Sequence, residues 1–151
     1  MAHISMNTPL GALTIFEESA SIVVIEFGRA ATPDASPLVM EAKRQLDAYF
    51  DGQLKEFDLP LAPRGTPFQH AVWALLSAIP FGATRTYGDL ARRLGTSPRP
   101  IGGACGRNPI PIVIPCHRVV GSGSWPLGGY SGGEGVPTKL ALLRLEEQLL
   151  V

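Results

Sequence analysis

The stretch Thr86–Gly106, TYGDLARRLGTSPRPIGGACG, carries the start and stop signals of two short consecutive helices. Thr86 is a residue type that caps a helix N-terminus, and Gly95 is typical of the residue just beyond a helix C-terminus. Ser97-Pro98 then begins a second helix that runs to the end of the stretch. The two helices and the turn Gly95-Thr96-Ser97 have the proportions of a helix-turn-helix. This stretch therefore predicts a mostly helical domain.

The segment before this stretch predicts another helix of the same domain. Thr66-Pro67-Phe68-Gln69 has the form of a capping box with proline at the first helical position. Pro80 and Gly82 end the apolar periodicity that follows. The stripe expected to face the core consists of Phe68, Val72, Leu75, Leu76 and Ile79.

Three further segments complete this half of the chain. Pro109–Pro115 alternates prolines with Ile and Val, which predicts an extended segment that cannot be helical. Gly121–Gly135 is rich in glycine and predicts a loop. Thr138–Leu150 has the periodicity of a final amphipathic helix.

The N-terminal half has a different pattern. Leu10–Phe16 and Ser21–Phe27 are rich in Ile, Val, Leu and Phe and are separated by a short polar stretch, which predicts an antiparallel pair of strands. After a loop at 30–37, Ser36-Pro37 caps and starts a helix that runs to about Phe50. The residues expected on its core-facing side are Leu38, Ala42, Leu46 and Tyr49, with Gly52 beyond its end.

Leu59–Gly65, which contains two prolines, indicates a linker between the halves. We therefore expect two domains, 1–63 and 64–151, and an α+β fold class in which a small mixed α/β domain precedes a mostly helical one. The first domain has four basic and nine acidic side chains, and the second has nine basic and four acidic ones. This asymmetry indicates a basic working half, or else a chance scatter of surface charge.

Composition excludes several classes of protein. The 151 residues are 45% apolar and 17% charged, and no apolar run approaches eighteen residues, which argues against a disordered chain and a membrane-spanning helix. Two cysteines are too few for a disulfide scaffold, which favours a reducing compartment. Because the apolar N-terminal residues lack a preceding basic region, they do not resemble a signal peptide. We expect a cytoplasmic protein that does not bind membranes.

Cys116 lies between Pro115 and His117 at the end of an apolar segment. A thiol reacts as its thiolate, which a neighbouring imidazole or cation promotes. Adjacent Cys and His side chains often diverge, so the pair by itself is also typical of a buried structural cysteine. A metal site is not expected, since His3, His70 and His117 have no cysteine partners at ligand spacing.

The wider segment Arg99–Val120, RPIGGACGRNPIPIVIPCHRVV, resembles the active-site signature of the O6-alkylguanine-DNA alkyltransferases, also called methylated-DNA–protein-cysteine S-methyltransferases. The resemblance covers nearly the whole chain. It continues in Tyr49-Phe50-Asp51-Gly52, Gly65-Thr66-Pro67-Phe68-Gln69, Val72-Trp73, Ile79-Pro80-Phe81-Gly82, Thr86–Ala91, Tyr130-Ser131-Gly132-Gly133 and Leu142–Glu146. It implies a ribonuclease H-like fold for the N-terminal domain and a DNA-binding, alkyl-transferring C-terminal domain.

The resemblance implies a catalytic set of Cys116, His117, Glu146, Asn108 and Tyr87. Cys116 would take the alkyl group by in-line displacement, and His117 would draw the thiol proton away through a water. Glu146 would hold the imidazole, as the acid does in a Cys-His-carboxylate triad. Asn108 would hydrogen-bond backbone near the cysteine, and Tyr87 would donate a hydrogen bond to the departing base.

The resemblance also implies how DNA is held. The DNA-binding residues would be Tyr87, Gly88, Thr96, Arg99, Gly102, Gly103 and Ser122, and the base pocket would be lined by Cys105, Pro111, Tyr130 and Ser131. The target nucleotide must leave the duplex to be reached, and Arg99 matches the arginine that fills the gap. Small residues on the second helix of the helix-turn-helix permit close approach to a minor groove, or else tight helix packing.

The chain departs from the family pattern in places. Pro100 stands where alanine is usual, the loop Gly121–Gly129 is one residue longer and contains Trp125-Pro126, and two extra residues lie around Glu134–Pro137. Those loops border the expected pocket, so they bear on the size of adduct that it admits.

We therefore expect a monomeric DNA-repair protein that needs no cofactor. It would transfer a methyl or larger alkyl group from O6 of guanine, and from O4 of thymine, in double-stranded DNA to Cys116, irreversibly and once per molecule. The alternatives are a non-catalytic helix-turn-helix protein that binds alkylated DNA and a Cys-His-Asn thiol hydrolase. The intact set of catalytic residue types disfavours the first, and the helix-turn-helix with Arg99 disfavours the second.

Overall fold

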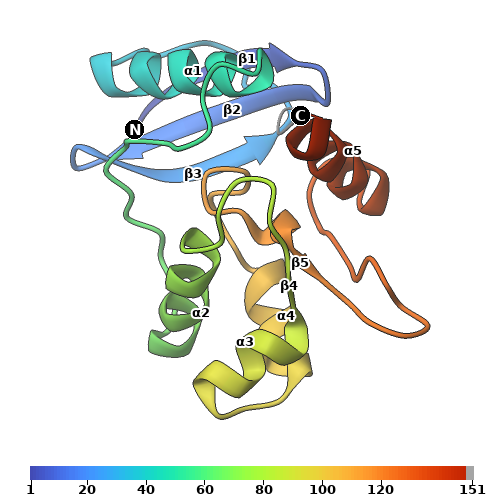
Figure 1. Cartoon of the computed structure of the whole chain (residues 1–151). Coiled ribbons are helices and arrows are strands. Elements are labelled where there is room, and N and C mark those ends of the chain that lie inside the picture. Colours follow the sequence, from blue (N-terminus) through green and yellow to red (C-terminus); the bar gives the residue numbers. More distant parts are fainter. Residues whose placement is uncertain (149–151) are drawn as a thin grey trace. The chain divides into compact units, whose positions relative to one another are not determined.

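The structure, a computed structural model, describes residues 1–148 (Figure 1). The chain divides into two compact units, Met1–Arg64 and Gly65–Val151. The first is a sheet covered by a helix, and the second is mostly helical, as expected for the α+β class.

Three antiparallel strands in the order β1-β2-β3 form the sheet of the N-terminal unit: β1 (Ala2–Thr8), β2 (Gly11–Glu18) and β3 (Ser21–Phe27). The predicted pairing of the second and third strands is confirmed, with Ile15 opposite Ile25 in the core. The strand β1 was not predicted, because its apolar residues alternate with His, Ser and Asn and lack the dense β-branched run of its neighbours.

Helix α1 (Pro37–Phe50) packs along the sheet, and Ser36 caps it by accepting a hydrogen bond from the Val39 backbone N–H (Figure 1). Its start and end are confirmed. The buried side chains are Val39, Ala42, Gln45, Leu46 and Tyr49. Leu38 is only half-buried, so the predicted face was wrong at that position: the covered stripe is rotated by one residue toward Val39.

The segment interpreted as a linker is partly attached to the N-terminal unit. The Ile22 N–H donates to Pro60 O at 2.8 Å, and the Ala62 N–H donates to Ile22 O at 2.9 Å, which places this segment beside β3. The buried Gln45 amide also exchanges hydrogen bonds with the Asp58 backbone. The backbone polar groups of this segment are therefore paired with β3, as those of a further strand at the edge of the sheet would be.

The C-terminal unit contains the helices α2 (Pro67–Ser77), α3 (Tyr87–Leu94), α4 (Pro98–Gly106) and α5 (Val136–Gln148), a 3₁₀ turn η1 (Cys116–Arg118), and the short parallel strands β4 (Arg85–Thr86) and β5 (Val119–Val120). The capping box at Thr66 is confirmed, since both of its hydrogen bonds with Gln69 form. A second capping box joins Thr86 and Asp89 at the start of α3. Gly95 ends α3 in the left-handed region at φ +67°, which glycine adopts without steric cost.

The buried face of α2 differs from the predicted stripe. Trp73 is 2% exposed, whereas Phe68 is 36% exposed and Leu75 is half-buried. The Trp73 indole N–H donates to Ala104 O in α4 at 2.9 Å, and a Cβ on Gly65 would lie 2.4 Å from the indole ring. The tertiary partner α4 therefore selects Trp73 as the core residue.

Two other predictions need correction. Pro109–Pro115 is not helical, but it is not extended either: Ile112 has φ +74°, and the Ile114 N–H donates to Ile110 O at 2.9 Å, so the segment makes a tight turn. Helix α5 begins at Val136, two residues before the predicted Thr138, because Pro137 is accommodated in the first helical turn. Its predicted last residues, 149 and 150, lie outside the described residues. Within residues 1–148, no helix is long and apolar enough to cross a bilayer.

Candidate alkyl-transfer site

A cavity of about 840 Å³ opens in the C-terminal unit, between the start of α3, the helix α4, η1 and the glycine-rich loop. Its lining residues are Thr86, Tyr87, Gly88, Arg92, Pro98, Arg99, Gly102, Cys105, Gly106, Cys116, Gly121, Ser122, Trp125, Gly129, Tyr130 and Ser131. This set contains most of the residues singled out from the sequence. The cavity wall does not include the expected catalytic residues Asn108, His117 and Glu146, which lie behind it. It also does not include three residues expected to contact DNA or the base: Thr96, Gly103 and Pro111.

Cys116 begins the turn η1, and its side chain lies at the inner wall of the cavity with 8% of the residue exposed. Burial raises the pKa of its thiol. A hydrogen bond with the Asn108 side chain and the positive charge of Lys139 act in the opposite direction and lower that pKa. The thiolate therefore has two stabilising neighbours in an otherwise apolar site.

Asn108 braces the turn that leads to Cys116. Its Nδ2 donates to Ile114 O at 2.8 Å, and its Oδ1 accepts from the Ile110 N–H at 3.0 Å. The Cys116 N–H in turn donates to Ile114 O at 2.8 Å. One amide side chain thus connects both arms of the turn, so the position of the sulfur depends on it.

Behind Cys116, His117 and Glu146 form a buried pair. His117 Nε2 lies 2.7 Å from Glu146 Oε2, and both side chains are almost completely buried. Arg118 binds both oxygens of the same carboxylate, with Nε 2.9 Å from Oε1 and Nη2 2.9 Å from Oε2. Its Nη1 donates to Ile79 O at 2.7 Å. The fork-shaped guanidinium fixes the plane of the carboxylate and balances its charge.

This arrangement determines which nitrogen of His117 can act as a base. The Glu146 carboxylate, held by Arg118, only accepts hydrogen bonds, so Nε2 of His117 carries the proton. Nδ1 then has the lone pair, and it has no hydrogen-bond partner among residues 1–148. Burial lowers the pKa of His117, while its hydrogen bond with Glu146 opposes that shift. The imidazole is therefore neutral and able to accept a proton at neutral pH.

Tyr87 and Lys139 form a second polar pair at the cavity. Lys139, fully buried on α5, donates to Val119 O and Gly129 O and lies 3.4 Å from the Tyr87 hydroxyl. Burial lowers the pKa of Lys139 to about 8 and raises that of Tyr87 to about 12. Tyr87 is thus a phenol that keeps its proton at neutral pH, beside a lysine that loses its charge unusually easily.

Tyr130 and Cys105 line the cavity near Cys116. The Tyr130 hydroxyl is buried without a partner in the described part of the chain, and burial raises its pKa. Burial also raises the pKa of Cys105, to about 12, so this second thiol is a poor nucleophile. Ser131 extends the same wall, with its hydroxyl donating to Gly106 O.

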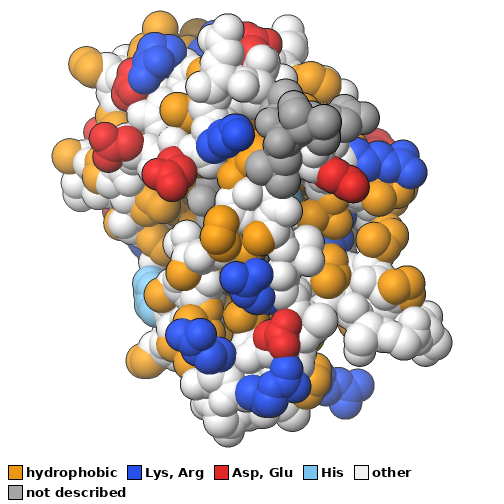
Figure 2. Space-filling model, in the orientation of Figure 1, with side chains coloured by type: hydrophobic (Ala, Val, Ile, Leu, Met, Phe, Trp, Pro, Cys, Tyr) orange, Lys and Arg blue, Asp and Glu red, His pale blue; other side chains and the backbone are white. Residues whose placement is uncertain are grey.

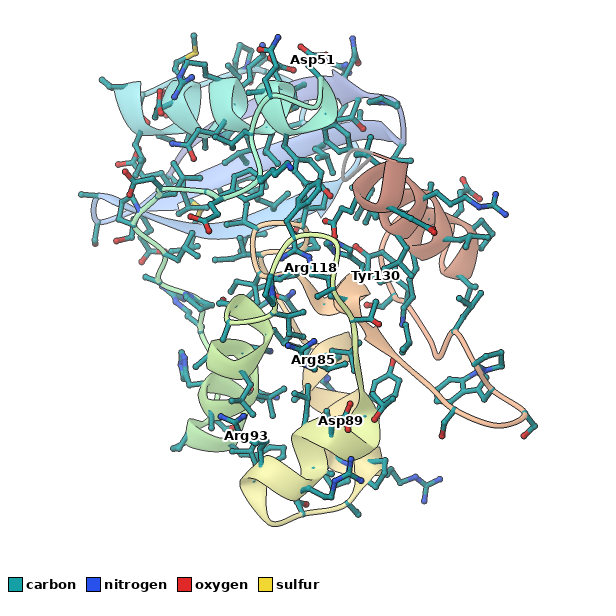
Figure 3. The ribbon with its side chains drawn as sticks, in the orientation of Figure 1. Asp51, Arg85, Asp89, Arg93, Arg118 and Tyr130 are labelled. Atoms are coloured by element: carbon teal, nitrogen blue, oxygen red, sulfur yellow. The ribbon has the colours of Figure 1, made fainter. Side chains whose placement is uncertain are left out.

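The outer rim of the cavity is basic. Arg92 and Arg99 line it and are exposed, and arginine side chains gather over the part of this unit that carries α3 (Figure 2). Figure 3 shows Asp89 and Arg93 projecting from α3, whereas Arg118 and Tyr130 lie farther from it, toward α5. A Cβ added at Gly103 would have no neighbour within 4 Å, so the surface of α4 is open there.

Three residues at the site were missed by sequence reasoning. The sequence patterns assign no role at the site to Arg118 or Lys139, and they place Trp125 only in a longer loop. A lysine between the apolar start of α5 and Leu140 was the one signal of a buried cation. For Arg118, no local signal exists, since its partner Glu146 is 28 residues away.

Known proteins resemble this chain over both of its units. Residues 67–148 match the family described as "6-O-methylguanine DNA methyltransferase, DNA binding domain", and residues 1–63 match its "ribonuclease-like domain". The methylated-DNA–protein-cysteine methyltransferase of Methanosarcina acetivorans is 40% identical, with 97% of this chain and 98% of the relative covered. The constitutive enzyme of that name from Bacillus subtilis is also 40% identical, with 95% and 94% covered.

Among solved structures, the crystal structure of Mycobacterium tuberculosis OGT in complex with DNA has a TM-score of 0.87 and 39% identity, covering 99% of this chain and 94% of that one. The structure of a Methanococcus jannaschii O6-methylguanine DNA methyltransferase has a TM-score of 0.68 and 28% identity, covering 95% and 93%. Matches of this extent span both units of the chain. The chain belongs to the O6-methylguanine DNA methyltransferase family.

Proposed function

We propose that this protein transfers a methyl or larger alkyl group from O6 of guanine, and from O4 of thymine, in double-stranded DNA to Sγ of its own Cys116. The observation that carries this proposal is the position of Cys116 at the inner wall of an 840 Å³ cavity, with the neutral His117 and its partner Glu146 directly behind it. The relatives named methylated-DNA–protein-cysteine methyltransferase support the same activity.

The first step is removal of the thiol proton. Nδ1 of His117, the nitrogen not engaged by Glu146, accepts this proton through a water. The resulting imidazolium lies against the Glu146 carboxylate, which stabilises its charge. The cation of Lys139 and the hydrogen bond with Asn108 stabilise the sulfur anion before it reacts.

In the second step the sulfur attacks the alkyl carbon in line with the bond to O6. The S–C bond forms, the C–O6 bond breaks, and its electron pair passes to the guanine. Tyr87, which remains protonated because of its raised pKa, donates a hydrogen bond to the departing base. The backbone amide at Ser131 donates a hydrogen bond to O6. The thioether formed at Cys116 is stable in water, so each molecule acts once. The alkyl group passes directly from guanine to sulfur, and this transfer requires no cofactor.

DNA is bound through the exposed side of α3 and α4, which we propose is a helix-turn-helix. The target nucleotide leaves the duplex, and the Arg99 side chain at the start of α4 fills the space that it vacates. The open surface at Gly103 and the basic rim support this placement, because small residues let the helix approach the groove and cations neutralise phosphates. Thr96 and Gly88 flank the same surface.

We further propose that 1–63 and 64–151 are separate domains and that the protein is monomeric and cytoplasmic. The compact units and the extents of the two family matches support the domain division. Two free cysteines support a reducing compartment.

The decisive experiment measures the intact mass of the protein after incubation with a duplex that contains O6-methylguanine. We expect a gain of one methyl group per chain, located by peptide mapping on Cys116. Cys105→Ser is the matched control and should still gain the methyl group, whereas Cys116→Ser should gain none but still bind the duplex. Binding without any mass change in the wild-type protein would favour a non-catalytic binder of alkylated DNA.

A further inference from the structure

Trp125 is a large apolar side chain that the core does not use. It is 59% exposed and lines the cavity at its mouth. Its indole ring is stacked on the Tyr87 ring, with 5.8 Å between ring centroids and an interplanar angle of 10°. One face of the indole therefore covers Tyr87, and the ring still exposes most of its surface to solvent.

The loop around Trp125 is shaped to hold this pose. The Trp125 N–H donates to Ser122 O at 3.2 Å, and the Gly128 N–H donates to Trp125 O at 3.3 Å. A Cβ added at Gly121 would lie 1.8 Å from Trp125 O, and one added at Gly128 would lie 2.6 Å from the Tyr87 ring. Both glycines are thus required by close contacts, so the backbone on either side of Trp125 is held in tight turns next to the Tyr87 ring.

A flat aromatic surface beside exposed arginines has the chemistry of a nucleobase platform. Base–aromatic stacking uses a π-face and tolerates any base, while the neighbouring Arg92 and Arg99 can bind phosphates. A protein partner would need a larger apolar patch, and the other exposed large apolar residues, such as Met40 and Phe68, do not line this cavity.

We propose that Trp125 contacts the DNA by stacking on a nucleobase that is unstacked when the target nucleotide leaves the duplex. This inference rests on the proposed function. The base is either the flipped purine itself or a base left in the duplex beside the gap, and both present the same π-face to the indole. Trp125 then continues the aromatic wall of Tyr87 outward, from the inner pocket to the DNA surface.

The test compares Trp125→Phe, which keeps an aromatic ring, with Trp125→Leu, which keeps apolar bulk alone. Both changes are made in full-length Cys116→Ser protein, so that binding is measured without transfer. For a duplex containing O6-methylguanine, we expect Trp125→Leu to raise Kd about tenfold and Trp125→Phe to raise it less than threefold, from the usual strength of base stacking. Met40→Leu, at an exposed site in the other unit, is the control and should leave Kd unchanged.

Tryptophan emission gives a second readout, because the chain has only two tryptophans and Trp73 is buried. Added damaged duplex should quench the emission of Cys116→Ser protein, and Trp125→Phe should abolish that quenching. Equal affinities for Trp125→Leu and its parent, or emission unchanged by DNA, would overturn the inference.

Free O6-benzylguanine separates the two sources of the base. If Trp125 stacks on the flipped purine, Trp125→Leu with an intact Cys116 will react more slowly with this free base as well as with duplex. If it stacks on a base left in the DNA, only the duplex reaction will slow. Failure of the proposed function is recognised independently, as wild-type protein that gains no methyl group from the duplex.

Discussion

His117 Nε2 and Glu146 Oε2 lie 2.7 Å apart, and both side chains are almost fully excluded from solvent. This contact joins residues 29 positions apart and orients the His117 imidazole next to Cys116. Arg118 holds the same carboxylate through two nitrogens. The three residues make a charge-balanced unit in which each member depends on the others.

Glu146→Gln should slow alkyl transfer by up to about 10²- to 10⁴-fold, the range that a positioned general base contributes, because His117 is no longer oriented and its cation no longer stabilised. The same change leaves Arg118 buried without its anion, which should cost about 3–5 kcal/mol of unfolding free energy. Transfer is followed by intact mass, and stability by urea denaturation. Glu147→Gln, at the exposed neighbour, is the matched control, and equal effects at the two positions would contradict the role of Glu146.

The rate of alkyl transfer should begin to fall with decreasing pH only below pH 6.5, because burial lowers the pKa of His117. The transfer rate should hold as pH falls through 6.5, where an exposed histidine is half-protonated, and decline only at lower pH. The hydrogen bond with Glu146 raises this pKa, so Glu146→Gln should move this decline to still lower pH. A transfer rate that is already halved at pH 6.5 would contradict the assignment of the buried His117 as the base.

Stability has a related pH dependence. The unfolded chain binds a proton at His117 below about pH 6.5, whereas the folded protein resists that proton. The unfolded state therefore gains protons first, and the free energy of unfolding should fall as pH drops below 6.5. Denaturant titrations of wild type and His117→Asn at pH 7.5 and 5.5 measure this, and an identical pH response of the two proteins would refute it.

Lys139→Met should slow transfer at pH 7, because the wild-type cation lowers the pKa of Cys116. The pKa of Lys139 is about 8, so its charge fades as pH rises through that value. The ratio of wild-type to variant rates should therefore shrink between pH 7 and 9. Arg144→Met, an exposed cation on the same helix, should change little. A ratio independent of pH would mean that Lys139 acts only by packing against Val119 and Gly129.

Arg99→Ala should slow repair of duplex DNA by about one to two orders of magnitude, since flipping costs roughly a few kcal/mol and each 1.4 kcal/mol is tenfold in rate. Free O6-benzylguanine needs no flipping, so its reaction with Cys116 should be almost unchanged. Both reactions are followed by intact mass, with Arg144→Ala as control. A similar decrease in the reaction rate with both substrates would mean that Arg99 supports the fold or stabilises the thiolate instead of filling the vacated space.

Thr86→Ala and Thr66→Ala should each cost about 1 kcal/mol of unfolding free energy, because each hydroxyl caps a helix. Only Thr86→Ala should also slow transfer, since Thr86 precedes Tyr87 and lines the cavity. Chemical denaturation and transfer rates of the two variants separate these effects. Slower transfer in Thr66→Ala would indicate that the transfer rate depends on the overall stability of the protein and not on Thr86 itself.

Features of the chain that depend on neighbouring residues were predictable from the sequence. The helix starts at Ser36, Thr66 and Thr86 and the stop at Gly95 follow from hydrogen bonds and φ values within one turn, and the structure places them there. The family was recognisable because the cysteine motif is continuous in sequence.

The buried faces depended on partners elsewhere in the chain. Val39 and Trp73 are core residues where Leu38 and Phe68 were expected, since the covering element selects the stripe and an apolar side chain at either position satisfies the helical period. The strand β1 needed its neighbour β2 to pair its backbone, and its own residues carried little signal.

The sequence by itself determined the local elements and the family motif that contains Cys116, because caps, turns and a continuous motif act over a few residues. Tertiary structure alone decided that Arg118 holds Glu146, that Lys139 is buried against Tyr87, and that Trp125 lies on the same ring. Those contacts join residues 28, 52 and 38 positions apart. The pKa shifts of Lys139 and Tyr87 follow from burial and from charges that only the folded chain brings within range.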